Sequence, residues 1–119
     1  MNETKFDFED GNGPVAAHRH QNGDGWVADT ATVGRLAYVG PEARVYGHAR
    51  VDGSAWVMDR ARVYGNARVS GLAAVFGDAR VFGYAKVLDR AQVLDRAQVF
   101  GESIIGSTRH VCGIQKVQS

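Results

Sequence analysis

Residues 43–102 decide the fold: ARVYGH ARVDGS AWVMDR ARVYGN ARVSGL AAVFGD ARVFGY AKVLDR AQVLDR AQVFGE. Written in sixes, this stretch repeats the pattern A-x-V-x-[GD]-x. The same spacing of branched aliphatic residues continues back to Val27 and forward to Val111, and alanine stands two places before each of them from Ala31 to Ala97. A repeat of this regularity indicates a solenoid, in which similar units stack on one another.

The six-residue period excludes an α-helix and favours short strands. Six residues turn a helix through about 600°, so the apolar face would move from one repeat to the next. In a strand, by contrast, the alanine and valine of A-x-V point to the same side, and the residue between them points away. The Gly-x or Asp-x that follows tolerates left-handed backbone and forms a corner. Each hexapeptide is therefore predicted to be one strand and one corner.

The A-x-V-x-[GD]-x run resembles the bacterial hexapeptide-repeat proteins, whose [STA]-x-[LIV] steps form a left-handed parallel β-helix of triangular cross-section. The resemblance covers residues 25–114 and implies about five coils of 18 residues, three hexapeptides to a coil. The family contains acyltransferases, carbonic anhydrases and non-enzymes, usually as trimers. Glycine stands two places after valine here, whereas the transferases more often place it directly after the aliphatic residue. This departure brings the chain closer to ARVYGNARVSG-type repeat proteins of bacteria and phages.

Composition and the two ends set the remaining expectations. The 119 residues suffice for one domain. We expect an N-terminal cap segment at 1–24, the β-helix at 25–114 and a C-terminal tail at 115–119. The net charge of +1 argues against general nucleic-acid binding, and no apolar stretch is long enough to cross a membrane. The single cysteine, Cys112, fits a cytoplasmic protein, in the host cytosol if a phage encodes it.

An 18-residue coil places residues 18 apart in columns, about 4.8 Å from one coil to the next. One predicted face carries a column of arginines beside a column of aromatic rings. Like charges at this spacing repel unless an anion neutralises them, guanidinium groups suit phosphate, and aromatic rings suit a nucleobase. We therefore expect a small anionic ligand to bind at Arg44, Arg62, Arg80, Tyr46 and Tyr64. The alternatives are arginines that stay solvated or that pair with acids of a neighbouring subunit.

Five apolar residues are expected to form a subunit interface. Phe82 and Phe100 continue the aromatic column, and Met58, Phe76 and Leu94 form a column on another face. Together they predict a contiguous apolar surface of the kind that monomers seldom expose. We expect a homo-oligomer, with a trimer favoured by the family resemblance.

No metal or catalytic group emerges from the histidines. His18 and His20, with His48 or His110, could supply three zinc ligands, but their spacing does not match the carbonic-anhydrase-like members. His48 could act as a general base, as in the acyltransferases, yet no loop interrupts the repeats. His110 and Cys112 flank inward Val111 without an orienting acid nearby. The sequence therefore predicts no catalytic residue, no metal and no cofactor.

These observations favour a non-enzymatic oligomeric protein that holds a small anionic, nucleotide-like ligand at grooves between subunits. One hypothesis is a phage-type protein that sequesters signalling nucleotides. The alternatives are an acyltransferase of the hexapeptide class and a structural or assembly module.

Overall fold

The structure is a computed structural model that describes residues 5–9, 11, 13–106, 110–111 and 116–118. The described residues form strands and turns, with no helix. Within these ranges no helix is long and apolar enough to cross a membrane.

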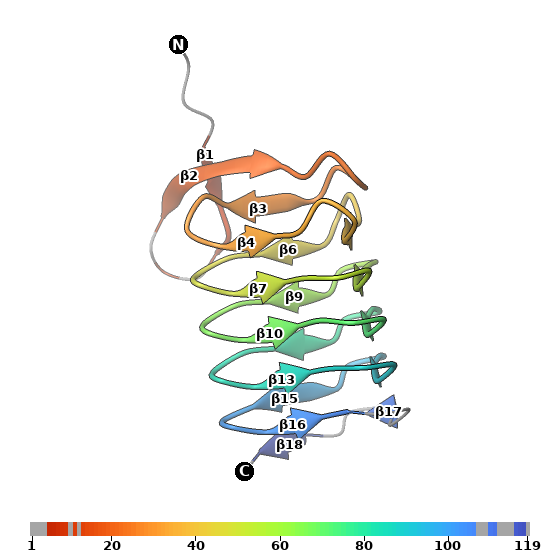
Figure 1. The fold of residues 1–119 in the computed structure, drawn as a ribbon. Helices are drawn as coiled ribbons and strands as arrows, with labels where there is room; N and C mark the ends of the chain where they lie inside the picture. The colour runs from red at the N-terminus through yellow and green to blue at the C-terminus, as the bar shows by residue number, and fades with distance from the viewer. Residues whose placement is uncertain (1–4, 10, 12, 107–109, 112–115, 119) are drawn as a thin grey trace.

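Three sheets run along the molecule and make an all-β parallel β-solenoid (Figure 1). The first contains β3 (Trp26–Ala28), β6 (Arg44–Val45), β9 (Arg62–Val63), β12 (Arg80–Val81), β15 (Gln98–Phe100) and β18 (Lys116–Gln118). The second contains β4 (Thr32–Val33), β7 (Arg50–Val51), β10 (Arg68–Val69), β13 (Lys86–Val87) and β16 (Ile104–Ile105). The third contains β5 (Tyr38–Val39), β8 (Trp56–Val57), β11 (Ala74–Val75), β14 (Gln92–Val93) and β17 (His110–Val111).

The register confirms the β-helix predicted from the repeat. Val45 pairs with Val63 and Val69 with Val87, so partners on adjacent parallel strands are 18 residues apart. The left-handed sense and the count of five coils remain predictions, as do the segment boundaries.

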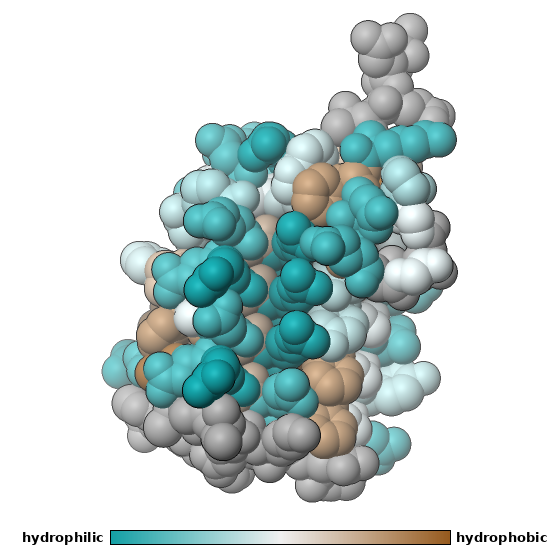
Figure 2. Space-filling model, turned by 180° about the vertical axis from the view of Figure 1, so that it is seen from behind, coloured by the Kyte–Doolittle hydropathy of each residue, from teal (hydrophilic) through white to brown (hydrophobic). Residues whose placement is uncertain are grey.

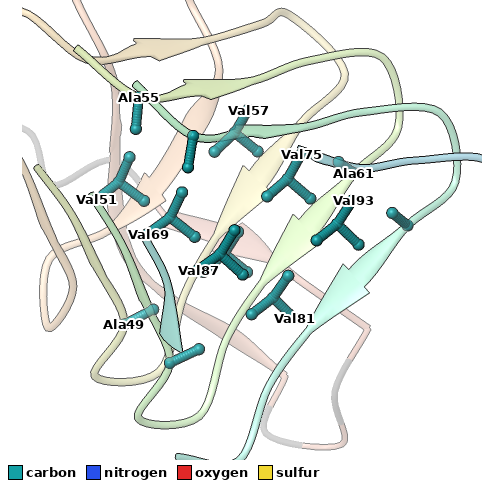
Figure 3. Packing of buried hydrophobic residues seen from close by; sticks show 14 of the residues in the cluster. Ala49, Val51, Ala55, Val57, Ala61, Val69, Val75, Val81, Val87 and Val93 are labelled. Atoms are coloured by element: carbon teal, nitrogen blue, oxygen red, sulfur yellow. The ribbon is translucent and has the colours of Figure 1, made fainter. Parts of the chain in front are cut away.

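The core consists almost entirely of the repeated alanines and valines. Val51, Val69 and Val87 from the second sheet meet Val57 and Val75 from the third inside the solenoid, and all five are fully buried (Figure 3). Buried alanines stand immediately before each strand from β4 to β15, where the chain leaves a corner and little space remains for a side chain. Val33 is half-buried at the N-terminal end, where its strand β4 is the last of the second sheet.

The corners stack directly on one another through their backbones. At the corner between the first and second sheets, Asn66 N donates to Gly83 O at 2.7 Å, and Tyr84 N to Gly101 O at 2.8 Å. Gly65 has a φ of +68°, and a Cβ added there would lie 3.0 Å from the Gly83 nitrogen. Glycine is therefore favoured at this corner for two reasons: it adopts left-handed backbone without strain, and its lack of a side chain allows the next coil to approach.

The N-terminal segment extends the first sheet and then folds over its outer surface. Strands β1 (Lys5–Asp7) and β2 (Pro14–Arg19) form an antiparallel hairpin, and β2 pairs antiparallel with β3. Residues 20–25 lie alongside β5, where Gly25 N donates a hydrogen bond to Val39 O. Strand β2 and residues 22–25 thus lie at the N-terminal ends of the first and third sheets. The hairpin also reaches an outer face, where Phe8 is fully buried.

Candidate functional site

The predicted arginine column exists on the outer face of the first sheet. Arg62 is the register partner of both Arg44 and Arg80, so the three side chains leave consecutive strands on one face. Figure 2 shows a strip of hydrophilic side chains along this stack, with separate hydrophobic areas beside it.

The N-terminal hairpin neutralises one of these arginines. Arg44 Nη1 lies 3.0 Å from Glu9 Oε1, and its guanidinium carbon lies 5.0 Å from the centre of the Phe6 ring. Pairing with acids of a neighbouring subunit was one alternative for this column, whereas this acid belongs to the same chain. Arg62 and Arg80 form no ion pair with any residue that the structure describes. Of the three arginines in this column, two therefore have no ion-pair partner among the described residues.

The neighbouring aromatic column is a continuous stack of rings. Tyr46, Tyr64, Phe82 and Phe100 follow one another with centroids 4.9, 5.0 and 5.1 Å apart and nearly parallel planes. Phe8 stacks on Tyr46 at 4.7 Å, next to the small side chain of Ala28, and leaves Tyr46 only 4% exposed. Both faces of Tyr46 and of Tyr64 are thus covered by other rings. The two predicted ligand-binding tyrosines offer ring edges, and no free face on which a base could stack.

A small pocket lies between the hairpin and the solenoid. It has a volume of about 250 Å³, and its walls include Phe6, Trp26, Arg60 and Arg62. Arg60 Nε is held 3.1 Å from Asp78 Oδ1. The predicted site residues did not include Phe6, Trp26 or Arg60. Only the folded hairpin brings Phe6 to this face.

A larger groove follows the corner between the first and second sheets, with a volume of about 590 Å³. Two columns of side chains line it, one from the corners and one from the strands of the second sheet. The corner column is His48, Asn66, Tyr84 and Glu102, and the strand column is Arg50, Arg68, Lys86 and Ile104. Neither column was predicted as a binding site from the sequence.

Three cations, Arg50, Arg68 and Lys86, stand in one column of this groove. Arg68 is the register partner of both Arg50 and Lys86, and none of the three forms an ion pair within the described ranges. Neighbouring strands lie about 4.8 Å apart, and two unit charges at that distance repel by about 1 kcal/mol in water. A bound anion would relieve this repulsion at all three positions.

The described histidine side chains lie in three different surroundings. His18 Nδ1 lies 2.7 Å from Asp29 Oδ1, at a site where both side chains are more than half exposed. The imidazole of His20 is buried, with Nε2 2.8 Å from the carbonyl oxygen of Ala37. His48 lines the groove beside Arg50. Among the described residues, no group of three His, Cys, Asp or Glu could hold a metal ion. Cys112 and the side chain of His110 fall outside the described part of the chain.

The predicted interface residues are half-buried on two separate faces. Phe82 and Phe100 belong to the ring stack on the first sheet, while Met58, Phe76 and Leu94 lie along the third. The corner between these faces bears a charged hollow whose walls include Asp59, Arg60 and Asp78. The expectation of one contiguous apolar surface was therefore wrong, because charged corners interrupt it. On the third sheet the surface continues to Trp56, which is 52% exposed.

Comparison with known proteins supports the repeat architecture. The model of the YdcK beta solenoid repeat matches residues 43–59 and 61–75, close to a quarter of the chain. No curated protein and no solved structure matches the chain. Together with the three parallel sheets, the family match supports a repeat β-helix protein.

Proposed function

We propose that this chain is a non-enzymatic binding protein that works as a homo-oligomer and holds a small anionic, nucleotide-like ligand. The site is the groove between the corner and strand columns, in place of the first-sheet face expected from the sequence. One observation carries the proposal: Arg50, Arg68 and Lys86 stand in one column of this groove, and no described acid pairs with them.

The groove combines the two kinds of group that a nucleotide needs. Guanidinium groups bind phosphate through two parallel hydrogen bonds, and ammonium groups bind it as point charges. Tyr84 is 64% exposed and stacks on no other described ring, so much of its surface is accessible to a base. The groove volume of about 590 Å³ also lies in the usual range of small-molecule sites.

Binding without turnover accounts best for the groups around this groove. A general base needs an orienting partner and a substrate proton within hydrogen-bond reach. His48 has no hydrogen bond to an acid within the described ranges. Such a protein would sequester its nucleotide ligand in the cytoplasm. In the acyltransferase alternative, acyl-coenzyme A would transfer its acyl group to an acceptor with release of free coenzyme A, and His48→Ala would stop that turnover.

Self-association would use the apolar column of the third sheet. Met58, Phe76 and Leu94 follow one another there beside the exposed Trp56 ring. Burying this apolar surface between copies would stabilise their contact by about 25 cal/mol per Å². The groove runs along the corner between the first and second sheets, so contact through the third sheet would leave it accessible to ligand.

Titration calorimetry with inorganic triphosphate and with mixed nucleoside triphosphates tests the binding proposal. We expect Arg68→Ala to weaken binding at least tenfold, because a charge-assisted hydrogen bond contributes about 1.5–3 kcal/mol. Arg90→Ala removes the same charge from an exposed corner that does not line the groove, and should leave binding within twofold. Equal losses in the two variants, or no binding by the wild-type protein, would refute the groove as an anion site.

A further inference from the structure

The binding groove changes character along its length. Its N-terminal coils present His48 with Arg50 and Asn66 with Arg68. The next coil presents Tyr84 with Lys86, and the last presents Glu102 with Ile104. One end is thus cationic and polar, while the other combines an exposed ring, an apolar side chain and a carboxylate. A ligand with different chemistry at its two ends would bind in a single orientation.

The backbone holds this order of side chains rigidly. His48 N donates to Gly65 O at 2.8 Å, and the equivalent bonds from Asn66 and Tyr84 measure 2.7 and 2.8 Å. Each corner is therefore fixed to the next at the strand spacing of about 4.8 Å, and the four coils span roughly 14 Å. That length accommodates a phosphate chain followed by a sugar and a base.

From this arrangement we infer that the groove prefers guanine nucleotides to adenine nucleotides, with the phosphates at Arg50 and Arg68 and the base at Tyr84, Glu102 and Ile104. The inference rests on the proposed function and adds the identity of the base. Lys86 lies between the two ends and neutralises the remaining phosphate charge.

The chemistry of Glu102 provides the selectivity. An ionised carboxylate only accepts hydrogen bonds, through two oxygens side by side. Guanine offers two neighbouring donors, the ring N1–H and the exocyclic amino group, and these match both oxygens. Adenine presents an amino group beside an unprotonated ring nitrogen, whose lone pair faces the second oxygen and repels it. No described residue donates a hydrogen bond to the Glu102 carboxylate or forms an ion pair with it.

Tyr84 and Ile104 supply contact area for the base but do not distinguish one base from another. Their side chains are 64% and 61% exposed. Stacking on a tyrosine ring favours any base, because every base has a flat face. Selection between purines therefore depends on the Glu102 carboxylate.

Calorimetric titrations with GTP, ATP and inorganic triphosphate test the inference on the full chain. Wild-type protein should bind GTP about tenfold more tightly than ATP, the difference expected from gaining or losing a hydrogen bond to a charged group. Glu102→Gln should weaken GTP binding to near the ATP value, while triphosphate binding stays equal or becomes slightly tighter. Glu42→Gln, an exposed acid outside the groove, should leave the preference intact.

Two failures are distinguishable. Equal affinity for GTP and ATP, combined with a tenfold loss in Arg68→Ala, would overturn the base preference and leave the phosphate site standing. No measurable binding of triphosphate or of either nucleotide would overturn the proposed function and the inference together. Circular dichroism of each variant excludes misfolding as the cause, and the exposure of Glu102 and Arg68 favours normal folding.

Discussion

The corner glycines provide a sharp test of how the coils are held together, and Gly65→Ala is the change that isolates their role. Gly65 has a φ of +68°, where a residue with a Cβ costs about 1–2 kcal/mol. The new methyl carbon would also lie 3.0 Å from the Gly83 nitrogen, and relieving that contact adds a cost of about 1–2 kcal/mol. We therefore expect Gly65→Ala to destabilise the protein by about 2–4 kcal/mol.

Thermal unfolding followed by circular dichroism measures this loss. For a chain of 119 residues, an unfolding entropy of about 2.1 cal/mol/K per residue converts it to a fall of roughly 8–16 °C in Tm. Gly34→Ala is the matched control. Gly34 has no positive φ, and its added Cβ would lie no closer than 3.6 Å to any neighbour. That variant should keep its Tm or gain slightly, because alanine restricts the unfolded chain.

The prediction has a second control in the chain's own corners. Asp59 and Asp95 adopt φ of 57° and 60° at equivalent corner positions. Since aspartate and asparagine tolerate left-handed backbone better than alanine, Gly65→Asn should lose less stability than Gly65→Ala. Equal losses in Gly65→Ala and Gly34→Ala, or an unchanged Tm in Gly65→Ala, would refute the account of the corners.

Two further changes test the outer surfaces. Phe8→Ala removes a fully buried ring that stacks on Tyr46, so it should destabilise hairpin docking by about 3 kcal/mol. Limited proteolysis should then cut residues 5–19 faster while the repeats stay protected, and an unchanged cleavage rate would contradict this docking. Phe76→Glu places a charge in the apolar column of the third sheet and should dissociate the oligomer, as measured by light scattering after gel filtration. Leu72→Glu, at an exposed corner, should leave the mass unchanged, and equal behaviour of the two variants would rule out the third sheet as the interface.

The repeated core could be predicted from sequence because each coil obeys one local rule. Val45, Val63 and Val81 recur every 18 residues, and the two-residue alternation of a strand leaves a single inward direction for them. The arginine and aromatic columns followed from the same arithmetic. Whether these side chains are free or already paired could not be predicted, because Glu9 and Phe8, which contact the columns, lie outside the repeat.

The fold of the hairpin onto the ring stack was missed although the sequence carried a signal. Tyrosine or phenylalanine fills the column at residues 46, 64, 82 and 100, whereas the same column begins with Ala28. That small residue leaves space for a ring from elsewhere, and Phe8 occupies it. The spacing of the repeat could not identify Phe8 as that ring, because Phe8 lies outside the repeat.

The binding groove was missed because corner side chains were treated as parts of turns. Tyr84 follows Gly83, whose φ of +68° sets the direction of the next residue. Only this backbone conformation brings Tyr84 and Asn66 beside the strand column of Arg68 and Lys86.

Chemical-shift mapping of the ¹⁵N-labelled protein during a GTP titration tests the central claim most directly. We expect shifts concentrated at the amides of residues 48–50, 66–68, 84–86 and 102–104, which border the groove. The arginine column of the first sheet, at residues 62–64 and 80–82, should move little. Shifts confined to that column, or no shifts at millimolar GTP, would contradict the groove as the ligand site.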